Sequence, residues 1–277
     1  MHFSETTPTR EQLDNVSPQD LRAFYAAKAS INPNLSTPSL PPTIPRVFAD
    51  TVAHEGETTA VMAVSEYQGI LQNFFVGFIG AKRILEVGTF TGSSAIFFAN
   101  ALKRNGVAGG PDANGNKPII SLDISEEYAN IARKNFVDAG VEDYIEVIVG
   151  DARKSLASLE GQTFDIVFLD ADKPSYKCYY DTAIEKNIIS KNGLIIADNT
   201  AFDFVTPYLG ISAPVADDAK PLDVSFDAFK GLPSIARAPG LGKAIHEFNE
   251  YIRHDPRTEA VLIPLFTGTT FIRILKD

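Results

Sequence analysis

Three oxygen-bearing side chains lie where two apolar segments of the chain end. Asp170 follows the apolar run 164–169, and Asp198 and Asn199 follow the run 194–197. If these runs are neighbouring strands of one parallel sheet, their carboxyl ends meet at one edge and bring the three side chains together. Two carboxylates and an amide oxygen suit a hard cation, whereas a set without His or Cys argues against zinc. We therefore predict a metal site at Asp170, Asp198 and Asn199, for Mg²⁺ first and for Ca²⁺ or Mn²⁺ as alternatives; solvated, capping strand ends are the other interpretation.

Lys173 lies three residues after Asp170, in the segment Asp170-Ala171-Asp172-Lys173. A lysine beside a bound cation has a lowered pKa and can act as a general base. We therefore predict that Lys173 takes the proton of an acceptor hydroxyl, and we count Asp170 with it in the catalytic set. The alternative is a surface lysine at a helix start, where its charge would be mildly unfavourable.

A turn flanked by glycines follows the apolar run 83–87. Gly88 and Gly92 allow the backbone to approach a ligand without a side chain in the way. Their spacing differs from the G-x-G-x-x-G of a dinucleotide fold, and no lysine follows as in a phosphate loop. Glu86 suits a ligand with a positive amino or sulfonium group rather than a pyrophosphate. The turn therefore indicates a nucleotide-like cofactor, with a simple strand-to-helix turn as the alternative.

Two further acidic residues end the next two apolar runs. Asp123 ends the run 118–123 and can accept both ribose hydroxyls, or cap a helix ahead of Ser125. Asp151 follows the run 144–149 and can accept a hydrogen bond from an adenine amino group, a role that can coexist with capping of the next helix. Successive strands with polar ends indicate a nucleotide site more specifically than any one of them.

Strand and helix patterns alternate from Arg83 onward, and this alternation predicts how the polar residues are positioned. Strands are expected at 83–87, 118–123, 144–149, 164–170 and 194–198, and helices at 93–102, 125–139, 152–159, 176–188 and 243–253. The strands are almost wholly apolar, as in sheets covered on both faces. The last two apolar segments, around Val261 and Phe271, predict a hairpin at the sheet edge. We predict an α/β fold with a doubly wound, mostly parallel, seven-stranded sheet and a C-terminal antiparallel hairpin.

A capping box at Ser65 predicts one more helix before the first strand. Its apolar residues fall on one helical face, which we expect in the core. They are Ile70, Leu71, Phe74, Phe75, Phe78 and Ile79.

The chain divides into an N-terminal helix with a proline-rich arm, residues 1–60, and a domain, residues 61–277. The first helix is expected at 17–28, where a proline follows the candidate cap, and the arm after it is extended. Within the domain, the segment 200–240 is apolar and broken by prolines. We expect it to be an acceptor-side insertion that acts as a lid, with a structural insertion as the alternative.

The composition fits a globular protein that acts on small molecules. The 277 residues are 44% hydrophobic and 22% charged, enough for one well-buried α/β domain. A net charge of −10 disfavours nucleic acid as a partner. No apolar run is long enough for a membrane span, and the first residues lack a secretory signal. The single cysteine, Cys178, fits a reducing compartment, so we expect a cytoplasmic protein without a membrane partner.

The order and spacing of these motifs resemble the caffeoyl-CoA O-methyltransferase-like family of class I methyltransferases, which is related to catechol O-methyltransferases. The matching segments are 81–92, 122–128, 149–152, 169–173, 197–199, 247–249 and 255–257. The resemblance implies S-adenosylmethionine as donor, a divalent cation at the three residues above, a base at Lys173 and a homodimer. It also implies that Tyr176 lines the metal-side pocket. The cofactor-binding set is Glu86, Gly88, Thr89, Ser93, Asp123, Ile124, Asp151, Ala152, Asp170 and Tyr179.

The sequence departs from the family on the acceptor side. The family carries a tryptophan soon after the Asp-Asn pair, whereas this chain has no tryptophan and places Ala201-Phe202 there. We predict methyl transfer to a metal-bound oxygen of a small acceptor, of the catechol type or another phenol. One alternative is a carboxylate O-methyltransferase that forms methyl esters. Another is an NAD-dependent oxidoreductase on the same sheet topology, against which the missing G-x-G-x-x-G argues.

Overall fold

The described part of the chain comprises residues 41–60, 62–201, 239–263 and 266–275 of a computed structural model, and every structural statement below concerns these residues. The helix expected at 17–28 lies outside them, as does nearly all of the expected lid.

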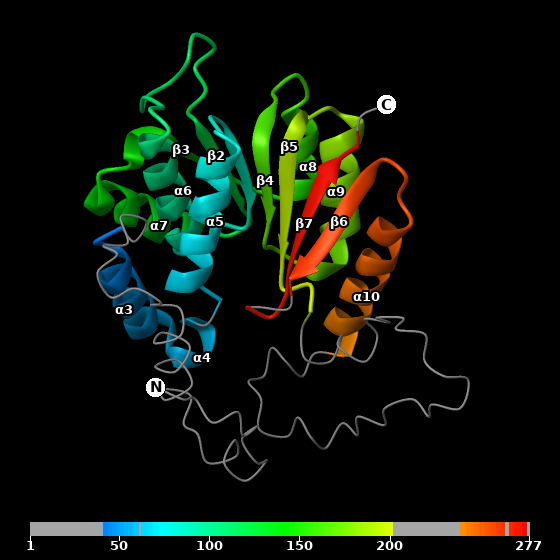
Figure 1. The fold of residues 1–277 in the computed structure, drawn as a ribbon. Coiled ribbons are helices and arrows are strands. Elements are labelled where there is room, and N and C mark those ends of the chain that lie inside the picture. The colour runs from blue at the N-terminus through cyan, green and yellow to red at the C-terminus, as the bar shows by residue number, and fades with distance from the viewer. Residues whose placement is uncertain (1–40, 61, 202–238, 264–265, 276–277) are drawn as a thin grey trace, which may run out of the picture. The chain divides into compact units, whose positions relative to one another are not determined.

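Seven strands form one sheet in the order β3-β2-β1-β4-β5-β7-β6 (Figure 1). Their bounds are β1 Ile84–Val87, β2 Ile119–Asp123, β3 Ile145–Val149, β4 Phe164–Leu169, β5 Ile189–Asp198, β6 Thr258–Ile263 and β7 Thr269–Ile274. Strands β1 to β5 are parallel, and β7 pairs antiparallel with both β5 and β6. The predicted fold class and C-terminal hairpin are therefore confirmed. The chain order reverses between β1 and β4, which is where ligands bind in such sheets.

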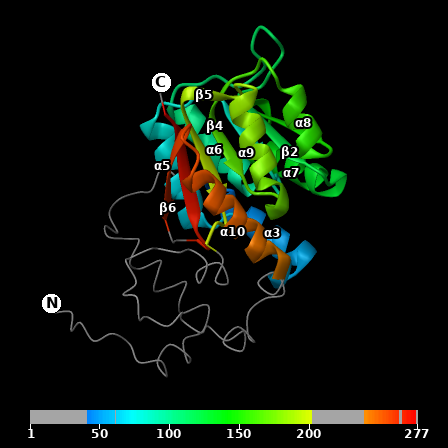
Figure 2. The same cartoon turned by 90° about the vertical axis from the view of Figure 1, so that its right-hand side faces the viewer.

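Helices cover both faces of this sheet (Figures 1 and 2). They are α3 Ile44–Glu55, α4 Glu57–Ala60, α5 Glu66–Phe78, α6 Ser93–Arg104, α7 Glu126–Ala139, α8 Ala152–Ser158, α9 Tyr176–Glu185 and α10 Pro239–Arg253, with short 3-10 helices η1 Glu142–Tyr144 and η2 Lys173–Ser175. Residues of α3, α5, α6 and α7 form one hydrophobic core with the sheet, and residues of α8, α9 and α10 form the other. No helix in the described ranges is long and apolar enough to cross a membrane.

The helix starts follow the capping signals in the sequence. Ser65, Ser125 and Asp151 each accept a hydrogen bond from a backbone N–H in the first turn of α5, α7 and α8. These bonds satisfy amide groups that have no partner within the helix. Local side-chain chemistry thus fixes where three of the helices around the sheet begin.

The orientation expected for α5 is wrong in part. Phe74 is 63% exposed and Phe78 is 75% exposed, although both belong to the stripe expected in the core. The buried face of α5 is instead made by Gln68, Gly69, Gln72, Asn73 and Val76. The cause lies on α6, because a Cβ at Gly69 would lie 2.3 Å from the ring of Phe97. The large Phe97 side chain therefore packs at the glycine face and turns part of the apolar stripe outward.

Helix α3 replaces part of the arm that was expected to be extended. Pro45 lies in its first turn, where proline costs no hydrogen bond. Ile44 and Val47 are buried in the core shared with α5 and α6. The proline-rich composition therefore marked a helix start here, and burial of these two residues stabilises the helix.

Candidate active site

A cavity of about 880 Å³ lies at the carboxyl ends of the central parallel strands. It is lined by most of the residues predicted for cofactor, metal and catalysis, namely Gly88, Thr89, Ser93, Asp123, Ile124, Asp151, Ala152, Asp170, Lys173, Tyr179, Asp198 and Asn199. Its position at the reversal of strand order is the expected place for a ligand in this topology. The structure therefore brings the two predicted halves of the site into one cavity.

The turn after β1 requires its glycine for a steric reason. Gly88 has a φ of 105°, and a Cβ there would lie 2.2 Å from the backbone oxygen of Asp170. The end of β4 therefore approaches the turn as closely as two backbones allow. This contact brings the glycine turn and the first predicted metal ligand together in the same wall of the cavity.

The carboxylate of Asp123 organises that turn. Its Oδ2 accepts hydrogen bonds from the backbone N–H of Thr89 at 3.0 Å and of Phe90 at 2.8 Å. Its Oδ1 accepts one from the N–H of Ser125 at 2.8 Å. Each carboxylate oxygen can accept two bonds, so Oδ1 keeps capacity for a ligand hydroxyl. The N-cap of α7 is Ser125 and not Asp123, so the capping interpretation of Asp123 is wrong, and its role in ligand binding stays a prediction.

Asp151 is already engaged by a neighbour that sequence reasoning missed. Its two oxygens accept hydrogen bonds from the guanidinium of Arg153, at 2.9 Å from Nε and 2.7 Å from Nη2. This side-chain hydrogen bonding lowers the pKa of Asp151 to about 2. Arg153 also lines the cavity, and Asp151 caps α8 as expected. The contact of Asp151 with an adenine amino group stays a prediction.

Glu86 lies behind the cavity wall rather than in it. Its side chain is completely buried and is not part of the cavity lining. Burial raises the pKa of Glu86 to about 8, and the Ser121 hydroxyl donates a hydrogen bond to its Oε2. Within the described residues, Oε1 has no hydrogen-bond partner. The structure therefore does not support the argument from a negative charge facing the ligand, and a direct contact of Glu86 with a cofactor stays a prediction.

The predicted metal ligands lie together at the ends of β4 and β5. Burial, followed by the nearby charge of Asp170, raises the pKa of Asp198 to about 7, and Lys173 opposes this rise. A divalent cation would stabilise the charged form of a carboxylate that is buried beside another carboxylate. In the described ranges no group of three or more His, Cys, Asp or Glu side chains could hold a metal ion by itself, so the third donor would be the amide oxygen of Asn199. The residues present thus fit a hard cation.

Lys173 is held in place by two hydrogen bonds. Its Nζ lies 3.1 Å from Asp170 Oδ1 and 2.6 Å from the hydroxyl of Tyr176. Tyr176 is fully buried, and its hydroxyl lies 3.0 Å from the backbone oxygens of Leu169 and Asp198, which share its proton. Tyr176 therefore does not line the cavity as the resemblance implied; it supports the lysine from behind.

Several lining residues were not predicted. They are Met62, Ala63, Val64, Gln68, Phe90, Ser94, Leu122, Ser125, Tyr128, Gly150, Arg153, Ala171, Asp172, Leu241, Phe266 and Thr267. Those inside the motif segments, such as Phe90 and Tyr128, could have been found from their place in the motifs. Leu241, on α10, and Phe266 and Thr267, in the β6–β7 turn, carry no local signal, because only the tertiary fold brings them to the cavity.

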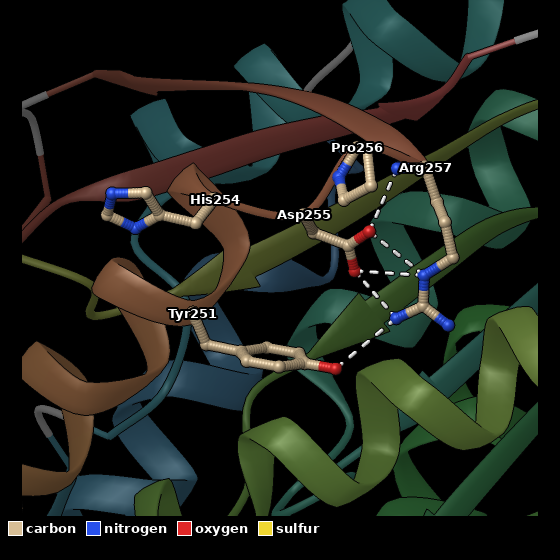
Figure 3. A pocket seen from close by; sticks show the side chains of 5 residues that line it. All are labelled: Tyr251, His254, Asp255, Pro256 and Arg257. Atoms are coloured by element: carbon tan, nitrogen blue, oxygen red, sulfur yellow. Dashed lines mark hydrogen bonds and ion pairs between the residues drawn. The ribbon is translucent and has the colours of Figure 1, made fainter.

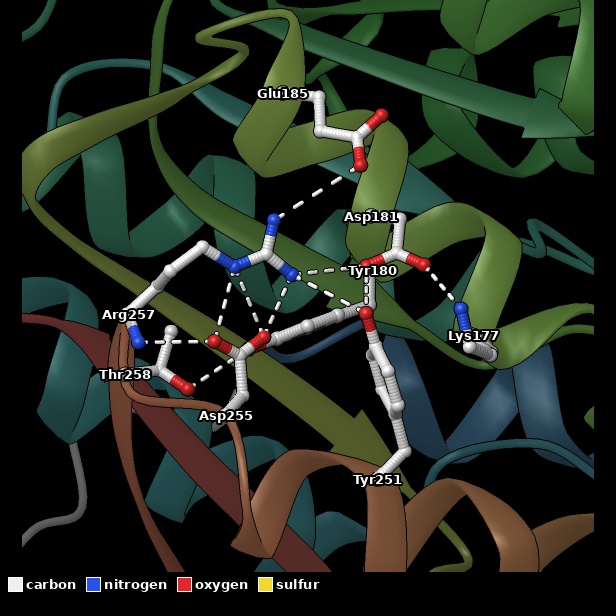
Figure 4. Close-up of polar contacts among 8 residues, drawn as sticks. All are labelled: Lys177, Tyr180, Asp181, Glu185, Tyr251, Asp255, Arg257 and Thr258. Atoms are coloured by element: carbon white, nitrogen blue, oxygen red, sulfur yellow. Dashed lines mark hydrogen bonds and ion pairs between the residues drawn. The ribbon is translucent and has the colours of Figure 1, made fainter.

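A second hollow, of about 350 Å³, lies away from the strand ends and is lined by Tyr251, His254, Asp255, Pro256 and Arg257 (Figure 3). Arg257 Nη2 lies 2.6 Å from Asp255 and 3.0 Å from Asp181 on α9, and the Tyr180 hydroxyl donates to Asp255 (Figure 4). Because the charged groups of Arg257 and Asp255 already satisfy each other, this hollow is an anchor between α9 and the turn that joins α10 to β6 rather than a second candidate site.

Comparison with known proteins agrees with this geometry. Residues 45–275 match a protein family described as O-methyltransferase. A catechol O-methyltransferase of Mycobacterium tuberculosis is 34% identical over 56% of this chain and 64% of its own length. A probable caffeoyl-CoA O-methyltransferase of Dictyostelium discoideum is 28% identical over 78% of each chain. The crystal structure of the SAH-bound Podospora anserina methyltransferase PaMTH1 is 26% identical, with a TM-score of 0.72, over 99% of this chain and 100% of that one.

Proposed function

The chain belongs to the O-methyltransferase family, and on this basis we propose that it transfers the methyl group of S-adenosylmethionine to an oxygen of a small acceptor. The acceptor class is a catechol-type or other phenolic hydroxyl, held at a divalent cation by Asp170, Asp198 and Asn199. Hydride transfer with a nicotinamide has no support in the family to which the chain belongs.

One observation carries this proposal. The cavity is lined both by the Gly88 turn and by Lys173, Asp198 and Asn199, and Lys173 Nζ lies 3.1 Å from Asp170 Oδ1. A donor at the turn and an acceptor at the carboxylates would thus share one enclosed space. Placing the two reactants together in this way supplies much of a methyl-transfer rate.

In the proposed reaction, the acceptor oxygen attacks the methyl carbon and the carbon–sulfur bond breaks. The sulfonium becomes the neutral thioether of S-adenosylhomocysteine, and the hydroxyl proton passes to Lys173 Nζ, which acts as the neutral amine after it has released its own proton to solvent. Tyr176 and Asp170 hold that nitrogen at the cavity wall. When bound, a divalent cation supplies positive charge that lowers the pKa of the acceptor hydroxyl.

A catechol is the acceptor class we favour. Its two adjacent oxygens can approach one cation together, and the donor set at β4 and β5 offers three protein side chains, which leaves positions for other ligands. The Mycobacterium tuberculosis relative, named as a catechol O-methyltransferase, supports the same class.

A homodimer in the cytoplasm completes the proposal. Phe74 and Phe78 on α5, and Val261 on β6, expose large apolar side chains that a second copy would cover. The single cysteine of the chain suits a reducing compartment. Light scattering of the pure protein should give twice the mass of one chain, and a monomer at all concentrations tested would contradict the dimer.

A mass-spectrometric acceptor screen tests the proposed reaction. Catechols, phenols and carboxylic acids are incubated with the protein, S-adenosylmethionine and Mg²⁺. We expect a methyl ether of at least one catechol together with S-adenosylhomocysteine. Methyl esters of the acids without any ether would instead support the carboxylate alternative.

A further inference from the structure

Backbone strain is concentrated at the cavity. Five residues other than glycine have a positive φ in the described ranges: Phe90, Asn187, Asn199, Phe266 and Thr267. All of them except Asn187 line the cavity. Left-handed conformations of bulky side chains are unfavourable and persist where the surrounding structure enforces them, which is characteristic of functional sites.

The β6–β7 turn contains the longest such run. Phe266, Thr267 and Gly268 have φ values of 56°, 64° and 86°. The turn is fixed to the chain that follows β5, because Ala201 N–H donates to Thr267 O at 2.8 Å and Thr200 N–H donates to Gly268 O at 2.9 Å. A Cβ at Gly268 would lie 2.2 Å from the nitrogen of Ala201. These contacts hold the turn in its strained conformation.

The turn also contacts a proposed cation ligand directly. Asn199 Nδ2 donates a hydrogen bond to Thr267 Oγ1 at 2.7 Å, and Thr267 in turn donates to the backbone oxygen of Phe266. The Asn199 amide is thereby fixed, and Phe266 lies one residue away from that contact. Phe266 therefore lines the same cavity as Asp198 and Asn199, next to the residue that contacts the Asn199 amide.

Packing against the described residues does not explain Phe266. Its ring belongs to neither hydrophobic core and is not among the side chains packed against them. An asparagine or glycine would adopt this backbone conformation more easily. A bulky aromatic residue is thus kept at an unfavourable position, half-buried, with its side chain at the cavity wall.

We propose that Phe266 is a specificity-determining residue that contacts the ring of an aromatic acceptor. The inference rests on the proposed function, because it assumes that the acceptor oxygens lie at Asp198 and Asn199. Aromatic rings attract one another through offset or edge-to-face contacts in addition to burial of their surface. Phe266 would therefore favour a catechol over a non-aromatic molecule that binds the cation equally well.

Two variants distinguish the effect of the Phe266 ring from the effect of the backbone conformation at this position. Phe266→Asn removes the ring and keeps a residue that tolerates the left-handed conformation, whereas Phe266→Tyr keeps the ring. Binding of catechol is measured by titration calorimetry with Mg²⁺ and S-adenosylhomocysteine present. We expect Phe266→Asn to raise the dissociation constant of catechol about tenfold. Phe266→Tyr should stay close to the unaltered protein, and neither variant should change the affinity for S-adenosylhomocysteine or lower the melting temperature.

The kinetic counterpart compares catechol with a non-aromatic chelating enediol as acceptors. Phe266→Asn should raise the KM of catechol and change that of the enediol little. Equal affinity of Phe266→Asn and the unaltered protein for catechol would overturn the inference, as would equal losses with both acceptors or with both variants. If the unaltered protein methylates no acceptor at all, the proposed function itself fails. If it methylates catechol and Phe266→Asn does so identically, only this inference fails.

Discussion

The hydroxyl of Tyr176 accepts a hydrogen bond from Lys173 Nζ at 2.6 Å, in a position closed to solvent. The same hydroxyl is shared by the backbone oxygens of Leu169 at the end of β4 and Asp198 at the end of β5. One buried group therefore connects the proposed base to both strands that carry the proposed cation ligands. The position of Lys173 is thus a property of the sheet and not of a flexible side chain alone.

Replacement of this hydroxyl should reduce turnover more than binding. In Tyr176→Phe, Lys173 loses its partner behind the cavity, and we expect kcat to fall by about tenfold or more with donor affinity unchanged. Two buried carbonyl groups also lose their donor, which should lower the free energy of unfolding by about 1–3 kcal/mol. Steady-state kinetics and urea unfolding measure the two effects.

Tyr180→Phe is the matched control, because Tyr180 is also fully buried on α9 and its hydroxyl bonds Asp255 and Thr258 instead. It should lower stability and leave kcat of the folded enzyme intact. Equal kcat values for the two variants would remove Tyr176 from a positioning role.

Asp123 should contribute to donor binding without help from a cation. Asp123→Ala removes the acceptor of the Thr89 and Phe90 amides and a candidate ribose partner, so donor binding should weaken by roughly 1–3 kcal/mol. Calorimetry in the presence of EDTA measures it. Asp112→Ala is the control, since Asp112 also accepts two backbone amides but in an exposed loop. Undiminished affinity in Asp123→Ala would exclude this residue from the donor site.

Thr267 should act on the cation through Asn199. In Thr267→Val the Asn199 amide loses its acceptor, so the Mg²⁺ concentration for half-maximal activity should rise by roughly tenfold. Thr267→Ser keeps the hydroxyl and should restore the original value. A Mg²⁺ requirement that is the same in all three proteins would show that the contact does not orient Asn199.

The ion pair between Asp255 and Arg257 should make the free energy of unfolding depend on pH. The hydrogen bonds from Arg257 lower the pKa of Asp255. Its charged form therefore stabilises the folded state at pH values above the ordinary pKa of aspartate. That contribution is lost as the pH falls below about 4. Asp255→Asn should therefore cost about 1–3 kcal/mol near neutral pH and progressively less in acid. Urea unfolding of both proteins across this pH range measures the effect. If the difference between their free energies of unfolding does not change with pH, the ion pair is not its cause.

The sequence predicted the elements whose signals are local. The caps at Ser65 and Asp151, the apolar strands and the terminal hairpin were all correct. It also identified the Gly88 turn and the acids after β4 and β5 as candidate site residues, and the structure brings them into one cavity because parallel strands end at a common edge.

Features that depend on a distant partner could not be predicted. The exposed side of α5 follows from the ring of Phe97 against Gly69, which no periodicity reveals. The raised pKa of Glu86 follows from its burial, and the engagement of Asp151 from the orientation of Arg153. The role of the β6–β7 turn requires that residues near 267 and 199 meet, although many residues separate them in the chain.

The central claim is methyl transfer from S-adenosylmethionine to an oxygen held at a divalent cation. Its most direct test is mass spectrometry of catechol incubated with metal-stripped protein and S-adenosylmethionine that carries a deuterated methyl group, with and without added Mg²⁺. We predict a singly methylated, deuterium-labelled catechol ether only when Mg²⁺ is present, and none from Asp198→Ala under either condition. The same labelled product at full rate from the metal-stripped protein would contradict the account.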